Sequence, residues 1–514
     1  MSGYSVAKSI FAPNSPREIW VHPPIVGAMS NRLRARANPA RPGRIAAMTA
    51  LLLCGVTLLF AYLNKARCAG APFESNGRSA AFDHIKDGRV CYSDIQFLWL
   101  GRDINEHVFP YLTGGITTHG ALTGGAVEYP VLSGLLMWLG AIGAHTDATF
   151  LLHSALLLAP FALLTAWMLG RLSGMAALLW AAGPPLVLYA FHNWELPVVC
   201  TSVGAVYVVT TLTRYSVRTR GVLAAILLGV GFCLKLYPGI FVLPLMIHVL
   251  VGGSDGLDAL RHRSALWRAV DPDGGVPDED DAPTRHTRRY DVRGAVMVAA
   301  TAVATAVLIN LPFALIGYQG WRASITFQEL RQADITSNSI WFWGLRPLFG
   351  DTPGGERSYQ DVVATASPML VVCAFGLAMW LGWRRYRVGG MFPWVGVSGA
   401  MLCGFLLLHK VHSPQYTLWL IPFLVLLEIP WSVVVAYLLA DASLGIGIFR
   451  YFHALGAGSS ADFEKHLVLF GVWGRALLLV YLFFAFVYLP VRGQRRAEPA
   501  RSRYSDDELI PASS

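Results

Sequence analysis

The chain has 514 residues, of which 54% are hydrophobic and only 14% are charged, and its mean hydropathy is +0.47. A soluble domain usually carries about 25% charged residues, so this composition excludes a soluble globular enzyme. The net charge of +9 does not indicate nucleic-acid binding, because the arginines cluster beside apolar runs and in short connectors. The sequence therefore predicts an all-α polytopic membrane protein.

The first 43 residues are rich in Pro, Asn, Ser and Arg and show no apolar period, which predicts a disordered cytoplasmic tail at 1–43. The first apolar run lies too far along the chain, and has flanks too basic, to be a cleaved signal peptide. We expect a retained first helix that leads outward. The membrane domain then extends over 44–490, and a second cytoplasmic tail follows at 491–514.

Long apolar runs recur along the whole membrane domain. A helix needs about 20 residues to cross a hydrocarbon layer ~30 Å thick, so these runs predict about 11–13 membrane segments. The runs lie at about 44–63, 129–144, 149–170, 174–191, 196–213, 221–234, 239–251, 294–316, 365–383, 391–408, 416–429, 431–449 and 467–489.

Arginine placement predicts which side each connector faces, because cytoplasmic loops carry an excess of Lys and Arg. The arginines of 214–220, 384–387 and 492–496 fit the cytoplasm, as does 252–293, which has the composition of a flexible insertion. The stretches expected to face outward are the large first loop 64–128, the loop 317–364, and 450–466.

This sidedness holds only under two conditions. The stretch 129–170 must make one net crossing plus a partly inserted or interfacial piece. The stretch 221–251 must form a hairpin with both ends in the cytoplasm, and its short arms place the tip at Lys235–Pro238.

The first outer loop carries the leading candidate residue, Asp94. The residues 95–100 are apolar enough to form a short interfacial helix, with Tyr92 and Trp99 at the level of the lipid headgroups. Asp94 would open this helix, either as its N-cap or as a general base that takes a proton from an acceptor hydroxyl. Asp103 and Glu128 are the alternative acids or bases, and Arg102 is expected to neutralise one of the two.

Lysine is rare in this chain, so a lysine at the tip of an apolar hairpin needs an explanation. Lys235 lies in the sequence Phe-Cys-Leu-Lys-Leu-Tyr-Pro-Gly. An intramembrane ammonium is costly unless it is paired, and the phosphate of a lipid carrier is a suitable partner. Otherwise, Lys235 extends to the headgroups and Tyr237 serves as an aromatic anchor.

A third group of polar residues follows the run that ends near residue 408. His409, Lys410, His412 and Gln415 lie within seven residues, and the two histidines would share a face if they stood on a helical turn. No carboxylate is near them in the sequence, so contacts to a phosphate or a sugar fit better than a zinc site.

Three weaker features have two interpretations each. Asn193 and Glu195, near the start of an apolar run, either bind sugar hydroxyls or cap a helix. Aromatic residues of 317–364, among them Trp341, either stack on a sugar or form an interfacial belt. Cys68 and Cys91 either form a disulfide that closes a loop of about 23 residues or remain unpaired.

Taken in order, these motifs resemble the GT-C superfamily of membrane glycosyltransferases that use polyprenyl-phosphate sugars, most of all glycosyltransferase family 87. The matching stretches span roughly 90–420. They are Ser93-Asp94-Ile95, Pro110-Tyr111, Tyr129-Pro130, Lys235-Leu-Tyr-Pro238 and Lys410-Val-His-Ser-Pro-Gln-Tyr-Thr-Leu-Trp419.

The resemblance implies a GT-C type fold in the plasma membrane, with an active site on the extracytoplasmic face. Asp94 takes the position of the family's catalytic carboxylate. Some relatives have Asp-x-Asp there, but this chain has Gln96, which favours metal-independent chemistry.

The expected reaction is an inverting transfer of a sugar, mannose or arabinofuranose, from a polyprenyl-phosphate donor to a glycolipid or cell-envelope glycan. Asp94 would act as the base, while Lys235, Lys410 and His409 or His412 bind the donor phosphate. Tyr237, Gln415, Asn193, Glu195 and Trp341 are candidate substrate contacts. The partners would be these substrates and membrane lipids, without nucleic acid or cofactor. The alternative is a lipid or solute transporter, although we find no internal repeat of the kind that many transporters show.

Overall fold

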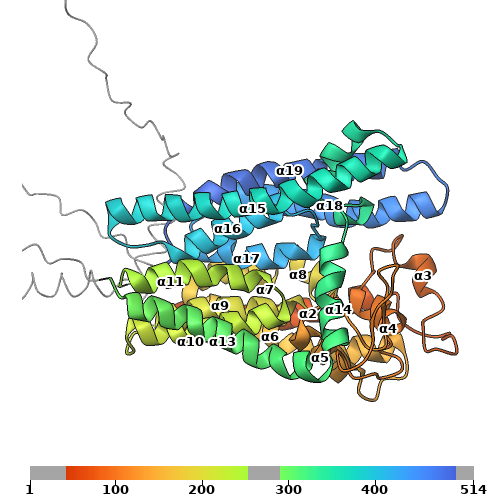
Figure 1. The fold of residues 1–514 in the computed structure, drawn as a ribbon, viewed down its shortest axis with the longest axis horizontal. Coiled ribbons are helices and arrows are strands. Elements are labelled where there is room, and N and C mark those ends of the chain that lie inside the picture. Colours follow the sequence, from red (N-terminus) through yellow and green to blue (C-terminus); the bar gives the residue numbers. More distant parts are fainter. Residues whose placement is uncertain (1–41, 253–289, 494–514) are drawn as a thin grey trace, which may run out of the picture. The chain divides into compact units, whose positions relative to one another are not determined.

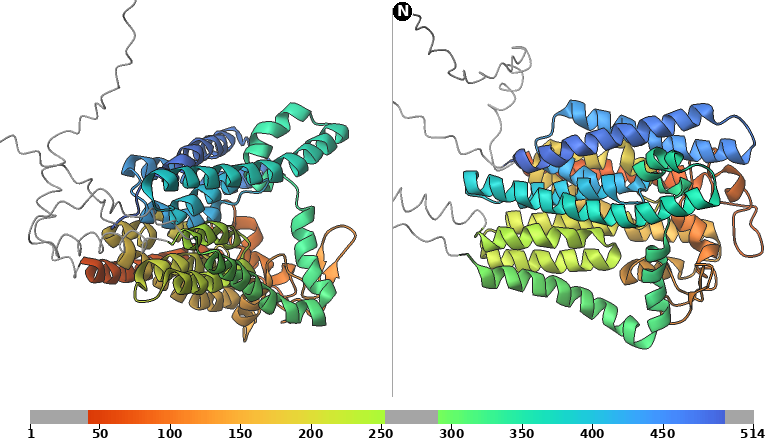
Figure 2. Two further views of the ribbon diagram at one scale, coloured as in Figure 1. Left: turned by 60° about the vertical axis from the view of Figure 1, so that its left-hand side comes forward. Right: turned by 45° about the horizontal axis from the view of Figure 1, so that its top comes forward.

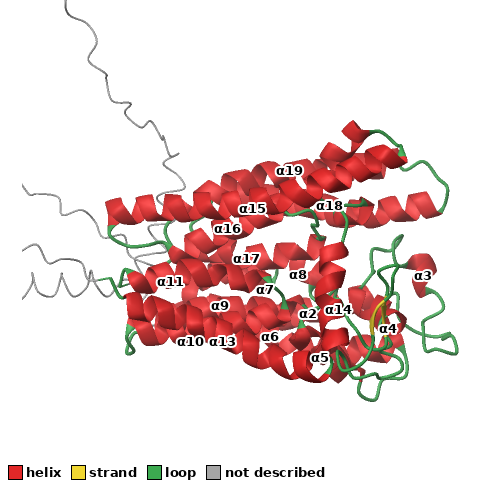
Figure 3. Ribbon diagram, in the orientation of Figure 1, coloured by secondary structure: helices red, strands yellow, loops and turns green. Residues whose placement is uncertain are grey.

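The computed structural model describes residues 42–252 and 290–493. The predicted tails at 1–43 and 491–514 and the insertion 252–293 therefore lie almost entirely outside the described residues. From Gly43 onward the described chain belongs to one compact unit. Most of it is helical, and its strands are confined to a small hairpin beside α4 (Figure 3).

Seven helical segments of the described chain are long and apolar enough to cross a membrane. The protein is therefore a helical, multi-pass membrane protein, as its composition predicts. Many of these segments bury less than half of their most apolar window, which leaves broad apolar faces for lipid. The helices are α2 (Pro42–Ala66), α6 (Asp147–Ser173, extended to Ala181 by shorter turns), α10 (Val217–Leu234), α13 (Val292–Ile316), α15 (Pro353–Gly389), α18 (Trp431–Gly456) and α19 (Asp462–Tyr488).

Shorter apolar helices fill the space between the long ones. They are α5 (Val131–Ala141), α9 (Glu195–Thr211), η2 with α11 (Tyr237–Phe241, Val242–Leu250), α16 (Trp394–Leu408), and η7 with α17 (Pro414–Tyr416, Thr417–Leu426). With 11 residues, α5 is about 16 Å long and cannot cross a bilayer by itself. This length suits the partly inserted piece expected within 129–170.

One predicted run is not a single helix. The stretch 174–191 is divided into η1 (Gly174–Ala177), α7 (Leu178–Ala181) and α8 (Pro184–Tyr189). Pro184 and Pro185 lack the N–H groups needed to continue a helix, so the chain turns at Gly183. This turn brings residues 190–194 to the start of α9.

The first loop folds into a compact structure. It contains α3 (Phe82–Ile85), α4 (Asp94–Gly101) and an antiparallel pair of strands, β1 (Gly115–Ile116) and β2 (Leu122–Thr123). Cys68 and Cys91 form a disulfide, which settles the choice that the sequence left open. Trp99 is only 1% exposed and its Nε1 donates to the carbonyl of Asn76, so the expectation that it lies at the headgroups is wrong.

The two later stretches that the sequence predicts to face outward are more helical than expected. The stretch 317–364 contains α14 (Tyr318–Leu330), the short turns η4 (Ile335–Ser337), η5 (Trp341–Leu345) and η6 (Arg346–Phe349), and the beginning of α15. The stretch 450–466 is mostly the ends of α18 and α19, which lie side by side in all views (Figures 1 and 2). These helices continue past their apolar windows because polar residues also support helical structure where water replaces lipid.

The ends of α15, α17 and α19 lie close together at one end of the bundle. Leu427, just after α17, pairs with Val491, just after α19, and the backbone N–H of Arg492 donates to the carbonyl of Leu426 (2.7 Å). Arg385 near the end of α15 donates to the carbonyl of Val487. The helices α4 and α14 lie toward the opposite end, where α14 runs across the direction of the long helices (Figure 1).

Candidate active site

Asp94 is the first residue of α4, and two neutral donors hold its carboxylate. Tyr92 Oη donates to Oδ1 (2.8 Å) and Asn193 Nδ2 donates to Oδ2 (2.7 Å). The side chain is half-buried, and the nearby Lys65 ammonium interacts with it by charge and not through a direct ion pair. Burial and the nearby Asp94 charge raise the pKa of the Tyr92 phenol, so Tyr92 stays protonated and able to donate.

The interpretation of Asp94 as an N-cap is wrong. Ser93 occupies the N-cap position of α4, and no side chain caps the helix. The Asp94 backbone N–H donates to the carbonyl of His192 (2.8 Å), which ties the start of α4 to the segment before α9. The carboxylate is thus held by side chains from outside its own helix and remains available for chemistry.

Gln96, two residues further on, points into the protein. It is fully buried, and its Nε2 donates to the carbonyl of Cys68 and to Asp147 Oδ2, both at 2.9 Å. Asp147 also accepts hydrogen bonds from the backbone and the hydroxyl of Ser79. Gln96 therefore connects the first loop to the start of α6, and its side chain does not lie beside the Asp94 carboxylate.

The two alternative carboxylates are already engaged. Glu128 forms a two-point ion pair with Arg102, at 2.6 and 3.1 Å, as expected for one of the acids. Asp103 has a positive φ of 53°, and its Oδ2 accepts from the backbone N–H groups of Gly124 (2.8 Å) and Gly125 (3.3 Å). Both therefore stabilise the folded loop, whereas the groups that donate to Asp94 are neutral side chains.

Lys235 terminates α10 at the hairpin tip and forms a buried ion pair with Glu195, the first residue of α9. The Lys235 side chain is 11% exposed and Glu195 is not exposed at all. The Lys235 ammonium faces the rings of Tyr129 (5.4 Å), Tyr416 (5.5 Å) and Trp419 (5.5 Å). We call these three rings the aromatic cage. Lys235 is thus paired within the protein, and a donor phosphate would have to share it with Glu195.

The cage connects Asp94 with the polar segment at 409–416. Asn193, which donates to Asp94, also donates to Tyr129 Oη (2.7 Å). Tyr416, which belongs to the 409–416 segment, stacks on Trp419 with the two ring centroids 3.8 Å apart. Trp419 in turn donates to Glu195 Oε2 (2.5 Å). Lys235 therefore stands between the predicted base and the predicted phosphate-binding segment.

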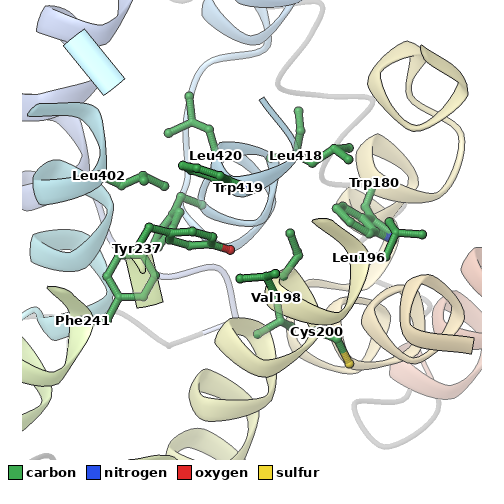
Figure 4. Packing of buried hydrophobic residues seen from close by; sticks show 14 of the residues in the cluster. Trp180, Leu196, Val198, Cys200, Tyr237, Phe241, Leu402, Leu418, Trp419 and Leu420 are labelled. Carbon is green, nitrogen blue, oxygen red and sulfur yellow. The ribbon is translucent and has the colours of Figure 1, made fainter. Parts of the chain in front are cut away.

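Tyr237 also stacks on Trp419, with the two ring centroids 4.3 Å apart (Figure 4). Below these two rings a narrow apolar hollow follows α9, α10, α16 and α17 toward their opposite ends. The residues that line it include Val199, Leu228, Phe241, Trp394, Phe423 and Leu426. The Tyr237 ring is thus part of the packed core and does not lie among the headgroups.

The two histidines lie in the loop between α16 and η7, so the helical turn on which they would share a face is absent. His409 caps α16, and its Nδ1 lies 2.9 Å from the carbonyl of Val411. His412 is 2% exposed, and its Nδ1 lies 3.1 Å from the carbonyl of Leu406. Burial lowers the pKa of both rings, and nearby cations lower it further, so both are neutral near pH 7.

Lys410 lies near a residue that the sequence analysis did not assign to the phosphate site, Arg331 at the end of α14. Burial and the Arg331 charge lower the pKa of the Lys410 ammonium. Two hydrogen bonds join the loop that contains Lys410 to the segment that follows α14. The His412 backbone N–H donates to the carbonyl of Ser337 (2.6 Å), and Trp341 Nε1 donates to the carbonyl of Leu408 (2.8 Å). Neither Lys410 nor Arg331 forms an ion pair among the described residues.

Trp341 and Gln415 are buried, so neither offers an open surface to a sugar in this structure. Trp341 packs against Tyr359 and Val363 of α15. Gln415 lies in η7, and its Oε1 has no hydrogen-bond partner among the described residues. Asn193 is also buried, but it contributes through its bonds to Asp94 and Tyr129.

Lys65, in the last turn of α2, is a second residue that sequence reasoning missed. It is 2% exposed, its Nζ donates to the carbonyl of Tyr92 (2.7 Å), and it lies 3.4 Å from His192 Nδ1. The only available signal was a lysine that closes an otherwise apolar helix, and such lysines usually extend to the headgroups.

Comparison with known proteins does not identify a family: no family model matches the chain, and no curated protein or solved structure matches it either. The candidate site therefore has to be judged on its own chemistry. Among the described residues, no three His, Cys, Asp or Glu side chains lie together as a metal site would require.

Proposed function

We propose that the protein is an integral membrane glycosyltransferase with a GT-C type fold, which moves a sugar from a polyprenyl-phosphate donor to a glycolipid or cell-envelope glycan. In this proposal the membrane is the plasma membrane and the reaction takes place at its extracytoplasmic face. The acceptor oxygen bonds to the anomeric carbon as the bond from that carbon to the phosphate oxygen breaks. The configuration at the anomeric carbon is inverted, and the polyprenyl phosphate leaves.

The observation that carries the proposal is the state of Asp94. It is an acid at a helix start beside the membrane helices, and neutral donors hold both of its oxygens. A carboxylate without a bound cation keeps the capacity to accept a proton, which is the task of a general base. Asp94 would take the proton of the acceptor hydroxyl as that oxygen attacks.

The donor phosphate would bind at Lys410 and Arg331. These are cations without ion-pair partners among the described residues, and their charges interact near the place where the 409–416 segment contacts the α14–η4 segment. Guanidinium and ammonium groups stabilise a departing phosphate by charge, more strongly where water is scarce. Lys235 lies between this site and Asp94, and its ion pair with Glu195 fixes the aromatic cage, beside which the sugar would sit.

The apolar hollow below Tyr237 and Trp419 has room for only about one water molecule in this structure, so the lipid part of the donor would enter it only if the surrounding helices separate. Its lining is apolar, and it runs along helices that are themselves long or apolar enough for the membrane interior. An isoprenoid chain has the same chemistry as this lining, so the hollow would bind it without exposing polar backbone. We expect the chain to widen the hollow as it enters.

Transfer of radiolabelled sugar tests this proposal. Purified protein in lipid would receive polyprenyl-phosphate mannose or polyprenyl-phosphate arabinofuranose, with a native glycolipid extract as acceptor. We expect product from one donor, and a loss of about 10²- to 10⁴-fold in the Asp94→Asn variant. Product formation should persist in the presence of a chelator.

Matched variants separate Asp94 from its neighbours. Asp83→Asn is the control, since Asp83 is an exposed acid in the same loop. Asp103→Asn and Glu128→Gln test the alternative bases. Full activity of a folded Asp94→Asn protein would exclude Asp94 as the base. Absence of product from both donors with folded wild-type protein would favour the transporter alternative.

A further inference from the structure

Two charged side chains lie inside the helical bundle, and the proposed reaction does not use them directly. Asp441 is on α18 and Arg475 on α19, and they are 1% and 3% exposed. Arg475 Nη1 lies 3.8 Å from Asp441 Oδ1. Ionisable residues within membrane-spanning segments are costly, so they are usually retained for a function.

The spacing between the two helices fixes this pair. Gly471 of α19 lies directly against Ala440 and Leu444 of α18, and a Cβ atom at position 471 would come within 2.6 Å of Leu444. Small residues at such a crossing let two membrane helices approach closely. The close approach at Gly471 therefore sets the distance between the helices that carry Asp441 and Arg475.

Thr417 connects the pair to the candidate active site. Its Oγ1 donates to Asp441 Oδ1 and lies 3.2 Å from Tyr437 Oη. Thr417 is fully buried and is the first residue of α17, directly after the turn Pro414–Tyr416. A bond to Thr417 therefore restrains Tyr416, one of the three rings of the aromatic cage.

Arg475 acts in this group as a counter-ion. Its Nε and Nη1 have no hydrogen-bond partner among the described residues, so its effect on Asp441 is one of charge. A charged acceptor makes the stronger hydrogen bond, which favours a well-held Thr417. The order of contacts is Arg475, Asp441, Thr417, Tyr416 and then Lys235.

We propose that Asp441, Arg475 and Thr417 are positioning residues, which hold the turn Pro414–Tyr416 so that Tyr416 closes the aromatic cage around Lys235. Their effect on the reaction rests on the function proposed above, but their effect on Tyr416 does not. The substitution Thr417→Val removes the hydroxyl, keeps the shape of the side chain and leaves the buried ion pair intact. Thr417→Ser keeps the hydroxyl.

The test combines a structural and a kinetic readout. Fluorine NMR of protein labelled with 3-fluorotyrosine would report on Tyr416, whose resonance is assigned with Tyr416→Phe. We expect Thr417→Val to shift or broaden this resonance and to lower kcat about 10- to 100-fold with little change in KM. Thr417→Ser should restore both. Asp441→Asn should affect the resonance as Thr417→Val does.

The control is Thr165→Val on α6. Thr165 is equally buried, but its hydroxyl donates to the carbonyl of Phe161 in its own helix (2.8 Å). An unchanged Tyr416 resonance in Thr417→Val would overturn the proposal, as would full activity despite a shifted resonance. If wild-type protein transfers no sugar, the proposed function fails, and the resonance alone decides whether these residues position Tyr416.

Discussion

Lys235 and Glu195 show how single residues define this site. Both were expected to contact substrate, but the structure pairs them with each other inside three aromatic rings. Burying an ion pair costs desolvation free energy, and close contact with good hydrogen bonding repays it. The pair therefore anchors the meeting point of α9, α10 and α17, and its charges are balanced before any ligand binds.

Removing only the acid of this pair should strongly destabilise the folded protein. In Glu195→Gln the Lys235 ammonium stays buried without a counter-ion, which should lower the free energy of unfolding by about 3–5 kcal/mol. The double variant Glu195→Gln/Lys235→Met should recover part of this loss. Thermal unfolding in detergent would measure both. Glu329→Gln is the control, because its ion pair with Arg322 is exposed. A single variant as stable as the double variant would contradict the buried-charge explanation.

His412 should make stability depend on pH. Burial and the nearby Arg475 charge lower the pKa of the His412 ring, so the folded protein resists a proton that the unfolded chain accepts near pH 6.5. Stability is then present above that pH and is lost as the pH falls toward the folded pKa, by at most about 1.4 kcal/mol per pH unit for one histidine.

Thermal unfolding between pH 7 and pH 5 would measure this effect. We expect a shallower fall in stability for His412→Gln than for wild-type protein. His119→Gln is the control, since His119 is exposed in the turn between β1 and β2. Identical pH slopes for wild-type and His412→Gln protein would show that His412 does not resist protonation in the folded state.

At the scale of elements, α5 supports the candidate site by packing on the first loop. Gly134 lies against Tyr111, and a Cβ atom there would come within 2.6 Å of the Tyr111 ring. Tyr111 Oη donates to the carbonyls of Tyr129 (2.8 Å) and Pro130 (3.0 Å), so it fixes the backbone of one cage residue. A glycine is needed because the helix and the ring leave no room for a methyl group.

Gly134→Ala should therefore separate α5 from Tyr111. We expect a loss of about 1–3 kcal/mol in stability, the usual cost of overpacking, together with lower transfer activity because Tyr129 moves. Thermal unfolding and the transfer assay would measure the two effects. Gly55→Ala in α2 is the control, since a Cβ atom there meets nothing within 4 Å. If Gly134→Ala were as stable as wild-type protein, the first loop would be able to shift away from the added methyl group without a cost in stability, which would contradict this explanation.

The disulfide Cys68–Cys91 fixes the segment directly before Tyr92. Closing a loop of 23 residues stabilises the folded state by roughly 3 kcal/mol in the chain-entropy description. Cys91→Ser should lower the unfolding temperature and the rate of transfer, because Tyr92 positions Asp94. Cys373→Ser is the control, since Cys373 is an exposed free cysteine. Equal unfolding temperatures of wild-type protein with and without reductant would contradict this role.

Helices could be predicted from the sequence more fully than their contacts. An apolar run is a local property, and most of the predicted runs coincide with described helices. Local reasoning failed where water supports a helix as well as lipid does, as at the start of α15, and where prolines break an apolar run, as at Pro184.

The candidate site was predictable as a set of residues but not as a set of pairs. Glu195 and Lys235 are 40 positions apart, and Gln96 and Asp147 are 51 apart, so nothing local indicates either contact. Lys65 and Arg331 were missed for the same reason, because their neighbours come from other elements. Asp94 could be proposed from the sequence because a single acid at the start of a short apolar helix is a local feature.

At the scale of the whole molecule, the structure separates a site end from an arginine end. Asp94, Lys235 and Lys410 belong to the site end. At the arginine end the arginines lie in or beside short connectors between apolar helices, where Arg218 pairs with Asp291 (2.7 Å) and Arg492 binds the carbonyl of Val425 (3.1 Å). Arginines of the site end, such as Arg102 and Arg346, lie in the longer polar stretches and pair with acids there. Since the excess of basic residues on the cytoplasmic side is counted over short connectors, this difference predicts that the site end faces outward.

Cysteine labelling in intact cells would test that orientation. In a Cys373→Ser background, His119→Cys places a thiol in the exposed turn at the site end. Val388→Cys places one near the end of α15 at the arginine end, where Val388 is 93% exposed. A membrane-impermeant maleimide should label position 119 in intact cells and position 388 only after permeabilisation. The reverse pattern would place Asp94 in the cytoplasm, where soluble nucleotide sugars are available, and would remove the reason to expect a lipid-linked donor.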